Sequence, residues 1–284
     1  MPELSFIASE ANDLLTFLQS FHLSKKNIQE LFTNKSLAIN GMEVIKNVRY
    51  EKGDLILIDY YEDTKITPFY QKLDIVYEDE DILAINKPIN LLVHPDGNSE
   101  QTLDNMVFAY YLQKNNSLNP RHLHRLDKDT SGLVLYAKHL LAHAFLNYQI
   151  EKELIEKHYY AIVQGEMEKP KGIIELPIGR NRHESNKYLV NLQGKSAVTI
   201  YHTIKSSHHF SLLDVVIKTG RTHQIRVHFA HFNHPVVGDK LYGKPAHRLM
   251  LHAYGLDFIH PRTRNRVSIR TRIPDDFLFK SEKS

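Results

Sequence analysis

The sequence contains no cysteine, which excludes a disulfide framework, a thiol nucleophile and a metal site built from thiolates. It also lacks any uninterrupted apolar run of the roughly 18 residues that a membrane-spanning helix needs. The first ten residues, MPELSFIASE, have neither the basic region nor the apolar core of a secretory signal. With 284 residues and 42% hydrophobic content, the chain is expected to be a globular protein of the cytoplasm that does not bind membranes.

Three motifs that would indicate a nucleotide site, a metal site or a kinase are incomplete. The segment from Gly238 follows the phosphate-loop pattern as far as its lysine, but Pro245 stands where a magnesium-binding hydroxyl is needed. The histidines between His223 and His234 are dense, yet the HExxH pair is absent. The HRLD tetrapeptide at 124–127 occurs in kinase catalytic loops, but no glycine-rich loop precedes it. We therefore expect no metal site.

The charge is modest overall but unevenly distributed. The net charge at pH 7 is +3, yet residues 121–284 carry 26 Lys and Arg against 15 Asp and Glu. Residues 1–60 carry 6 against 8, and residues 61–120 carry 4 against 10. A basic carboxy-terminal part favours a polyanionic partner such as nucleic acid, although proteins that bind nothing also carry such an excess.

The amino-terminal part has the pattern of a small α/β domain, which we place at residues 1–60. Two short helices are followed by strands; Ser24 is placed to cap the second helix, and Asn40-Gly41 is a strong signal for a two-residue hairpin turn. Residues 61–72 are polar and acidic, so we expect them to be a linker. Residues 73–284 then form a second, larger domain with mixed helices and strands.

Three lysines lie on or near the second predicted helix. Lys25, Lys26 and Lys35 are placed to meet phosphates. The acidic balance of residues 1–60 makes a solvated helix face nearly as plausible, and the sequence leaves both interpretations open.

The stretch His122–Lys138, HLHRLDKDTSGLVLYAK, places charged groups against a turn that leads into a buried strand at Leu133–Ala137. If the segment before the turn is extended, Arg125 and Asp127 point to one side and Leu126 to the other. One acid and one guanidinium then face the same space. Taken alone, the segment also fits a solvated turn whose carboxylates accept backbone N–H bonds.

Two later segments add candidate groups. Lys157–Val163 has the alternation of a strand, and Tyr159 on its buried face is either core or catalytic. A strand at 211–218 ends at a Thr-Gly turn, and residues 222–229 are predicted to be a helix. Arg221 would then lie at a strand-to-helix turn, where its guanidinium and the helix amino terminus both favour an anion, either a phosphate or an enzyme carboxylate.

Taken together, three segments resemble the core motifs of the RluA-type pseudouridine synthases, in order and at suitable distances. They are HRLDKDTSGL, KHYYAIVQG and KTGRTHQIRVHFAHFNHPVVGDKLYG. The segments LDIVYEDEDILAINKPINLLVHP and RLMLHAYGLDFIHP resemble the flanking family blocks, so that the likeness runs from residue 73 to about 275. Residues 11–59 are similar to the alpha-L RNA-binding domain of ribosomal small-subunit proteins.

The resemblance implies an α+β catalytic domain around a mixed, largely antiparallel sheet, which isomerises uridine in RNA without a cofactor. It assigns Asp127 as the catalytic aspartate, Tyr159 as the active-site tyrosine, Arg221 as the arginine that pairs with the aspartate, and Arg125 as the arginine that helps to displace the target base. In this chain Asn186 and Tyr188 stand where arginine and methionine are common. The expected site residues are Asp127, Tyr159 and Arg221 for catalysis, and His124, Arg125, Lys157, Arg226, Lys25, Lys26 and Lys35 for RNA binding.

Several alternatives remain open from the sequence. Asp127 either attacks the sugar or removes a sugar proton, and both roles need the carboxylate ionised, which a paired arginine favours. The target must also leave its stack, which is cheapest in loops and bulges. Large-subunit ribosomal RNA is the first choice of substrate, transfer RNA the second, and a monomer is expected. The competing classes are a non-catalytic RNA-binding protein on the same fold and an N-glycosidase that releases uracil.

Overall fold

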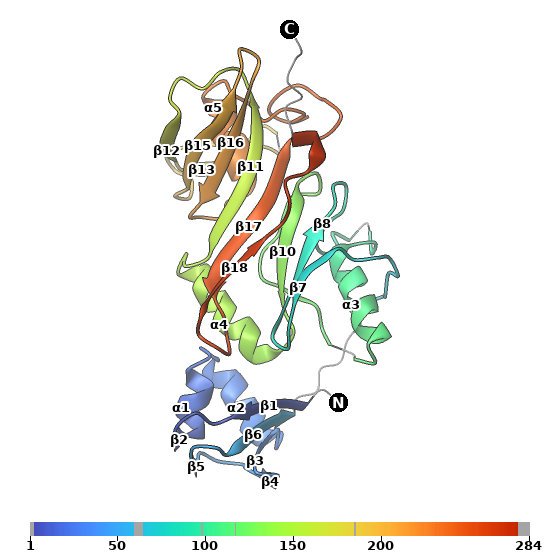
Figure 1. Ribbon diagram of the computed structural model, residues 1–284, viewed down its shortest axis with the longest axis vertical. Coiled ribbons are helices and arrows are strands. Elements are labelled where there is room, and N and C mark those ends of the chain that lie inside the picture. Colours follow the sequence, from blue (N-terminus) through green and yellow to red (C-terminus); the bar gives the residue numbers. More distant parts are fainter. Residues whose placement is uncertain (1–2, 60–64, 98, 117, 185, 278–284) are drawn as a thin grey trace.

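The computed structural model describes residues 3–59, 65–97, 99–116, 118–184 and 186–277. Within these residues, ten strands form the main sheet, in the order β12-β15-β16-β11-β17-β10-β8-β7, with β18 paired to β17 and β9 to β10 (Figure 1). These strands are β7 (Ile75–Glu78), β8 (Ile82–Lys87), β9 (Arg121–His122), β10 (Ser131–Ala137), β11 (Glu156–Gln164), β12 (Lys171–Glu175), β15 (Val198–Ser206), β16 (Phe210–Ile217), β17 (Leu251–Ile259) and β18 (Arg266–Arg270).

The main sheet is mixed and largely antiparallel, as the resemblance implies. Strands β10 and β17 are parallel, through Ser131–His252 and Gly132–Ala253, whereas the other pairs between the described strands are antiparallel. Gly132 has a φ of +119°, and a Cβ at this position would lie 2.2 Å from the carbonyl oxygen of Ala253. Only glycine fits where the two backbones come this close, which explains the Thr-Ser-Gly turn before β10.

Strand β10 is buried on both faces, and its residues alternate between two cores. Val134 and Tyr136 belong to the core that also contains residues of α3 (Leu103–Gln113) and α5 (Gln224–His231). Leu133 and Leu135 belong to the core that contains residues of α4 (Leu140–Glu151). The sheet is therefore covered by helices on both faces, and β10 is fixed from both sides. No helix in the described part of the chain is long and apolar enough to cross a membrane.

The amino-terminal residues form a separate small sheet in the order β1-β6-β3-β4, with two helices (Figure 1). Ser24 caps the second helix by accepting the N–H of Asn27, and Asn40-Gly41 turns with positive φ at both residues, so both predictions are confirmed. The elements are β1 (Glu3–Ile7), β2 (Asn12–Asp13), α1 (Leu14–Gln19), α2 (Lys25–Thr33), β3 (Leu37–Ile39), β4 (Met42–Glu43), β5 (Arg49–Tyr50) and β6 (Leu55–Asp59).

Several predicted elements of the larger part agree with the structure, and others differ. Strands β10, β11 and β16 lie where their patterns indicate. The predicted helix at 222–229 begins later, at Gln224, and β1 was not expected. Residues 61–64 of the predicted linker lie outside the described residues, and residues 65–72 have no helix or strand. The remaining elements are the two-stranded sheet β13 (Ile178–Arg180) and β14 (Tyr188–Val190), and the 3-10 helix η1 (Asp275–Phe277).

The amino-terminal unit packs on α4 and on the turn between β17 and β18. Phe145 of α4 belongs to the same apolar cluster as Phe21 and Leu18 of the small unit. The guanidinium of Arg264 lies over the rings of Phe21 and Phe145, 4.5 and 4.0 Å from their centroids. His22 stacks on Tyr148 with 3.6 Å between the ring centroids. Since one core runs across this boundary, the small unit has a defined position against the larger part of the chain.

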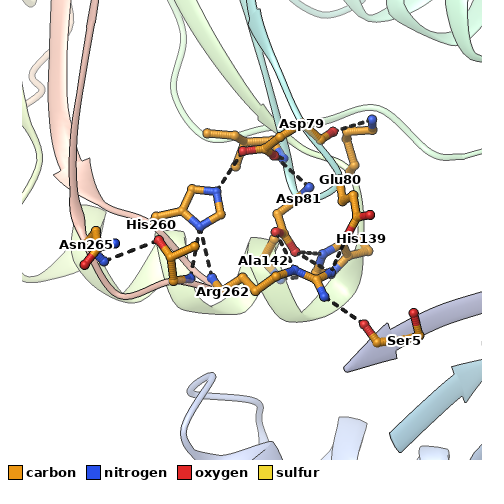
Figure 2. A network of polar contacts seen from close by, with 12 residues as sticks. Ser5, Asp79, Glu80, Asp81, His139, Ala142, His260, Arg262 and Asn265 are labelled. Carbon is orange, nitrogen blue, oxygen red and sulfur yellow. Dashed lines mark hydrogen bonds and ion pairs between the residues drawn. The ribbon is translucent and has the colours of Figure 1, made fainter. Parts of the chain in front are cut away.

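Figure 2 shows the polar part of this contact around Arg262. The guanidinium donates to both carboxylate oxygens of Asp81, at 2.8 and 3.0 Å, and to the carbonyl of Ser5 at 2.7 Å. Asp81 is only 2% exposed, and it also bonds His139 at 2.7 Å. The pKa of Asp81 is lowered, because the bonds to His139 and Arg262 outweigh the opposing effect of burial. Arg262 therefore joins the turn after β7, which carries Asp81, to the backbone of β1.

We expect the Arg262→Met variant to lose about 3 kcal/mol of unfolding free energy, because the buried Asp81 loses its charged partner. Denaturant unfolding measures this loss. Arg266→Met is the matched control: its side chain is 68% exposed and pairs with Glu156 at the surface, so the change should stay within about 0.5 kcal/mol. Equal stability losses in the two variants would contradict the role given to Arg262.

Candidate active site

A pocket of about 880 Å³ opens where the β9–β10 loop, strand β11 and the beginning of α5 meet. Asp127 and Arg125 line it from the loop, Tyr159 and Lys157 from β11, and Arg226 from the first turn of α5. Side chains that are up to about a hundred residues apart in the sequence thus line the same pocket. The predicted grouping of an acid, a guanidinium and a tyrosine is present in the structure.

Asp127 is held on a short loop that is tied to the sheet on two sides. The carbonyl of Asp127 accepts the N–H of Thr130 at 3.1 Å, which closes the turn before β10. The fully buried amine of Lys87 donates to the carbonyl of Lys128 at 3.2 Å and to those of Pro88 and Leu91 at 2.9 Å. The backbone beside Asp127 is therefore fixed, and its carboxylate projects into the pocket, where a guanidinium binds it.

Arg226 lies between two carboxylates. Its NH1 donates to Oδ2 of Asp127 at 2.9 Å, while Nε and NH2 form a bidentate pair with Asp239 at 2.7 and 2.8 Å. Asp239 is fully buried and Arg226 is 5% exposed. Burial opposes the charge of Arg226, but Asp239 and then Asp127 outweigh it and raise the pKa of the guanidinium. The arginine is thus permanently charged and cannot rotate freely away from Asp127.

The prediction that Arg221 pairs with Asp127 is wrong. The Nε of Arg221 donates to the carbonyl of Ser196 at 2.7 Å, and its NH2 lies 3.6 Å from Glu153. Arg226, which we expected to contact RNA, forms the pair with Asp127 instead.

The cause is the position at which α5 begins. The buried amide of Gln224 accepts the hydroxyl of Thr219 at 2.7 Å and the backbone N–H of Arg221 at 3.1 Å, and it donates to the carbonyl of Val198 at 2.9 Å. These bonds hold residues 219–221 in a turn outside the helix. As a result Arg221 lies on the wall of the pocket, and Arg226, which sits in the first turn, faces Asp127.

Two residues that the sequence pattern did not single out complete the surroundings of Asp127. His223 has a left-handed backbone, with φ of 57°, and its Nε2 lies 3.6 Å from Oδ2 of Asp127. Its Nδ1 lies 2.8 Å from the hydroxyl of Tyr242, which also accepts the N–H of Tyr188 at 2.9 Å. Burial lowers the pKa of His223, so the ring is neutral near pH 7. The backbone strain at His223, which is not a glycine, is typical of a functional position.

Tyr159 and Lys157 lie two residues apart on β11, so both side chains face the pocket. Tyr159 is 7% exposed, and burial, followed by the charge of Asp127, raises its pKa, so that the phenol keeps its proton at neutral pH. Burial also lowers the pKa of Lys157, against an opposing effect of Glu153. The pocket therefore presents a neutral hydroxyl and a largely buried amine beside the Asp127–Arg226 pair.

His124 and Arg125 lie on the same loop, the first in the pocket wall and the second exposed to solvent. His124 accepts the backbone N–H of Leu135 through Nε2 at 3.3 Å, and burial lowers its pKa to about 3, so it is a neutral wall of the pocket. Arg125 is exposed, and its NH1 donates to Nε2 of His94 at 3.1 Å. His94 in turn stacks on His122 with 5.5 Å between the ring centroids. Arg125 is thus the guanidinium of this loop that is open to solvent.

Lys25, Lys26 and Lys35 lie on the amino-terminal unit and not in this pocket. Lys26 is 3.8 Å from Glu30 and Lys35 is 3.1 Å from Glu43, in pairs that are well exposed to solvent. Lys25 and Lys35 also line a separate hollow of about 660 Å³, whose floor includes the apolar side chains Leu15, Ile28 and Phe32.

Two groups of histidine and acidic residues among the described residues have ligand atoms close enough for a metal: Asp79, Asp81 and His260, and Glu156, His158 and Asp257. Both groups already contain an arginine counterion. Arg262 binds Asp81 at 2.8 Å, and Arg270 binds Asp257 at 2.8 Å. None of these six residues lines the pocket around Asp127.

Comparisons with known proteins agree with this geometry. The sequence profile of a family described as RNA pseudouridylate synthase matches residues 81–231. An uncharacterised RNA pseudouridine synthase of Bacillus subtilis, YhcT, is 38% identical over 261 residues, which cover 89% of this chain and 86% of the relative. The ribosomal large subunit pseudouridine synthase D of Yersinia pestis is 34% identical over 276 residues, with 90% and 85% covered.

A solved structure shares the fold. Human RNA pseudouridylate synthase domain containing 1 matches with a TM-score of 0.61 and 28% identity, over 72% of this chain and 84% of that chain. The matched profile spans the loop of Asp127, the strand of Tyr159 and the first turn of α5. The chain therefore belongs to the RNA pseudouridylate synthase family, whose members isomerise uridine in RNA to pseudouridine.

Proposed function

We propose that this pseudouridine synthase acts on large-subunit ribosomal RNA and uses Asp127 as its catalytic carboxylate. The observation that carries the proposal is the Asp127–Arg226–Asp239 arrangement at the bottom of a pocket that accepts a base. A carboxylate held by a buried arginine stays ionised and aimed at one point. A protein that only binds RNA has no need for such a pair.

The isomerisation breaks the bond between C1′ of the ribose and N1 of uracil, turns the base, and forms a bond from C1′ to C5. Asp127 acts at the sugar, either by attacking C1′ or by removing a sugar proton. Both routes need an anion of fixed position, which the bond from Arg226 supplies. Water can attack the sugar intermediate and so release free uracil. A pocket whose bottom is shielded from water therefore favours isomerisation.

Tyr159 is proposed to hold the detached base and to assist transfer of the C5 proton. Its ring lies on the pocket wall, and its raised pKa keeps the hydroxyl protonated, so it can donate a hydrogen bond to a uracil oxygen. Arg125 is exposed at the rim and is proposed to fill the space that the target base leaves in the RNA. Lys157 and His124 are proposed to contact the nucleotide inside the pocket.

The names of relatives support ribosomal RNA as the substrate. Large-subunit synthases D from Yersinia pestis and Neisseria meningitidis are 34% and 38% identical to this chain. Transfer RNA is the second candidate. We also propose that residues 1–60 are an alpha-L RNA-binding domain, that residues 61–72 link it to the catalytic domain at 73–284, and that the enzyme is a cytoplasmic monomer without a cofactor. Lys25 and Lys35, which line the hollow of the small unit, support the RNA-binding role.

The substrate is tested by mapping pseudouridine across the transcriptome of a strain that lacks the gene. We expect signal to disappear at defined uridines of large-subunit ribosomal RNA and to return when the wild-type gene is restored. A strain complemented with the Asp127→Asn gene is the control for the loss of catalysis. Loss of signal in transfer RNA alone would reject the ribosomal substrate but not the reaction.

In the Asp127→Asn variant the rate of pseudouridine formation should fall at least about a thousandfold, while the affinity for RNA changes little. The amide keeps the size of the side chain and can still accept a bond from Arg226, but it cannot act as an anion at the sugar. Mass-neutral conversion of uridine is read by nuclease digestion and chromatography. Near wild-type conversion by the purified variant would remove Asp127 from the mechanism.

Replacing Lys25, Lys26 and Lys35 by Gln should weaken RNA binding and reduce the salt slope of the affinity by about 2. The triple variant is preferable to a deletion, because removal of the small unit would expose Phe145 and Leu141. The double variant Arg49→Gln, Lys52→Gln is the control, since these residues lie away from the lysine-lined hollow. An unchanged slope in the triple variant would leave the small unit a structural role only.

A further inference from the structure

A second pocket, of about 430 Å³, adjoins the one that contains Asp127. The two pockets share Gly220, Arg221 and Thr222 as a common wall. The far side of the second pocket is formed by β13, by Tyr188 of β14, and by the loop that carries Lys195. Its volume is in the range of sites that hold a small organic ligand, and its position makes it the next compartment along the cleft.

The second pocket is cationic. Arg180, Lys195 and Arg221 line it, and no carboxylate residue is among its lining residues. The guanidinium of Arg221 is held in the shared wall by the carbonyl of Ser196, 2.7 Å from Nε, and by Glu153, 3.6 Å from NH2. A guanidinium fixed between two pockets is suited to bind a phosphate that passes from one to the other.

The second pocket also contains an aromatic ring whose position depends on the active site. Tyr188 is half-buried and packs edge-on against His223, with 5.7 Å between the ring centroids. Its backbone N–H donates to the hydroxyl of Tyr242 at 2.9 Å, and that hydroxyl lies 2.8 Å from His223. His223 approaches Asp127, so the wall of the second pocket and the catalytic carboxylate share one chain of contacts. An aromatic ring in a cationic groove is a stacking platform for a base.

We propose that the second pocket binds the nucleotide next to the target uridine, with Arg221 on the phosphate that joins the two nucleotides and Tyr188 stacked against the neighbouring base. The proposal rests on the proposed function, because it takes the target uridine to occupy the pocket of Asp127. Consecutive nucleotides of one strand lie close together, and the two pockets are separated by their shared wall of Gly220, Arg221 and Thr222.

In this arrangement Arg221 has a different role from the Asp127–Arg226 pair. It acts in binding of the RNA and not in the chemical step, because its guanidinium contacts Ser196 and Glu153 and not Asp127. Since every base has a π-face, stacking on Tyr188 tolerates different neighbours. The pocket therefore supplies affinity and register along the strand and leaves the identity of the neighbouring base largely free.

The test uses the stem-loop around a uridine that the pseudouridine map identifies. Two further versions carry an uncharged methylphosphonate at the phosphate on the 5′ or the 3′ side of that uridine. Single-turnover rates at increasing enzyme concentration give kcat/KM and the saturating rate for the wild type and for Arg221→Gln. We expect one methylphosphonate to lower kcat/KM of the wild type about tenfold, with the saturating rate nearly unchanged, and to have no further effect on Arg221→Gln.

The stacking contact is tested in parallel with an RNA that is abasic at the neighbouring nucleotide. Tyr188→Ala should lower kcat/KM for the intact stem-loop about tenfold and should make the abasic RNA no worse than the intact one, whereas Tyr188→Phe should behave as the wild type. Arg182→Gln is the control for charge, because Arg182 is exposed and does not line the pocket. Thermal melting checks that each variant is folded.

The outcomes are distinguishable. Independent, additive effects of the methylphosphonates and of Arg221→Gln would overturn the subsite while leaving the reaction in place. The subsite would also be overturned if Arg182→Gln lowered kcat/KM as much as Arg221→Gln does. A tenfold fall in the saturating rate of Arg221→Gln with unchanged KM would overturn it as well. If the wild type isomerised no uridine in the stem-loop or in large-subunit ribosomal RNA, the proposed function itself would fail.

Discussion

The charge of Arg226 is the constraint on which the active site depends. A guanidinium that is 5% exposed is stable only if acceptors surround it, and Asp239, which is fully buried, supplies two of them. The third guanidinium nitrogen, NH1, faces the pocket, where it donates to the carboxylate of Asp127. Asp239 thus acts through Arg226: it does not line the pocket, but it determines where the carboxylate of Asp127 lies. The turn held by Gln224 places Arg226 in the first helical turn and completes this arrangement.

The scaffold keeps Asp127 and α5 at a constant separation. The loop of Asp127 leads into β10, which is buried on both faces and pairs in parallel with β17 at Gly132. The helix reaches the same region from the other end of the sheet, through the core that Ile225 and Phe229 share with Tyr159. On the opposite side, Arg262 ties the amino-terminal unit to the catalytic part. A rigid frame of this kind would hold the pocket and the proposed RNA-binding surface of the small unit in a fixed relation on one folded RNA.

The sequence predicts the local elements and the acid, guanidinium and tyrosine that meet in the pocket, but the wrong arginine is assigned to Asp127. The cap at Ser24 and the turn at Asn40-Gly41 depend on neighbouring residues only, so the pattern was sufficient. The start of α5 depends on bonds from Gln224 to β15, some 26 residues away, which no local pattern contains. That shift of two residues exchanged the roles of Arg221 and Arg226. The signal that could have identified Arg226 is its position between Ile225 and Val227, since a charge in an apolar run needs a buried partner.

The most direct measurement is the rate of tritium release from RNA labelled at C5 of uridine, under single-turnover conditions at saturating enzyme, for Arg226→Lys and Arg221→Lys. Lysine keeps a positive charge beside Asp239 but lacks the guanidinium fork that reaches Asp127. We expect the saturating rate to fall about a hundredfold for Arg226→Lys and to stay nearly unchanged for Arg221→Lys. A wild-type rate in Arg226→Lys together with a large loss in Arg221→Lys would contradict the role given to Arg226.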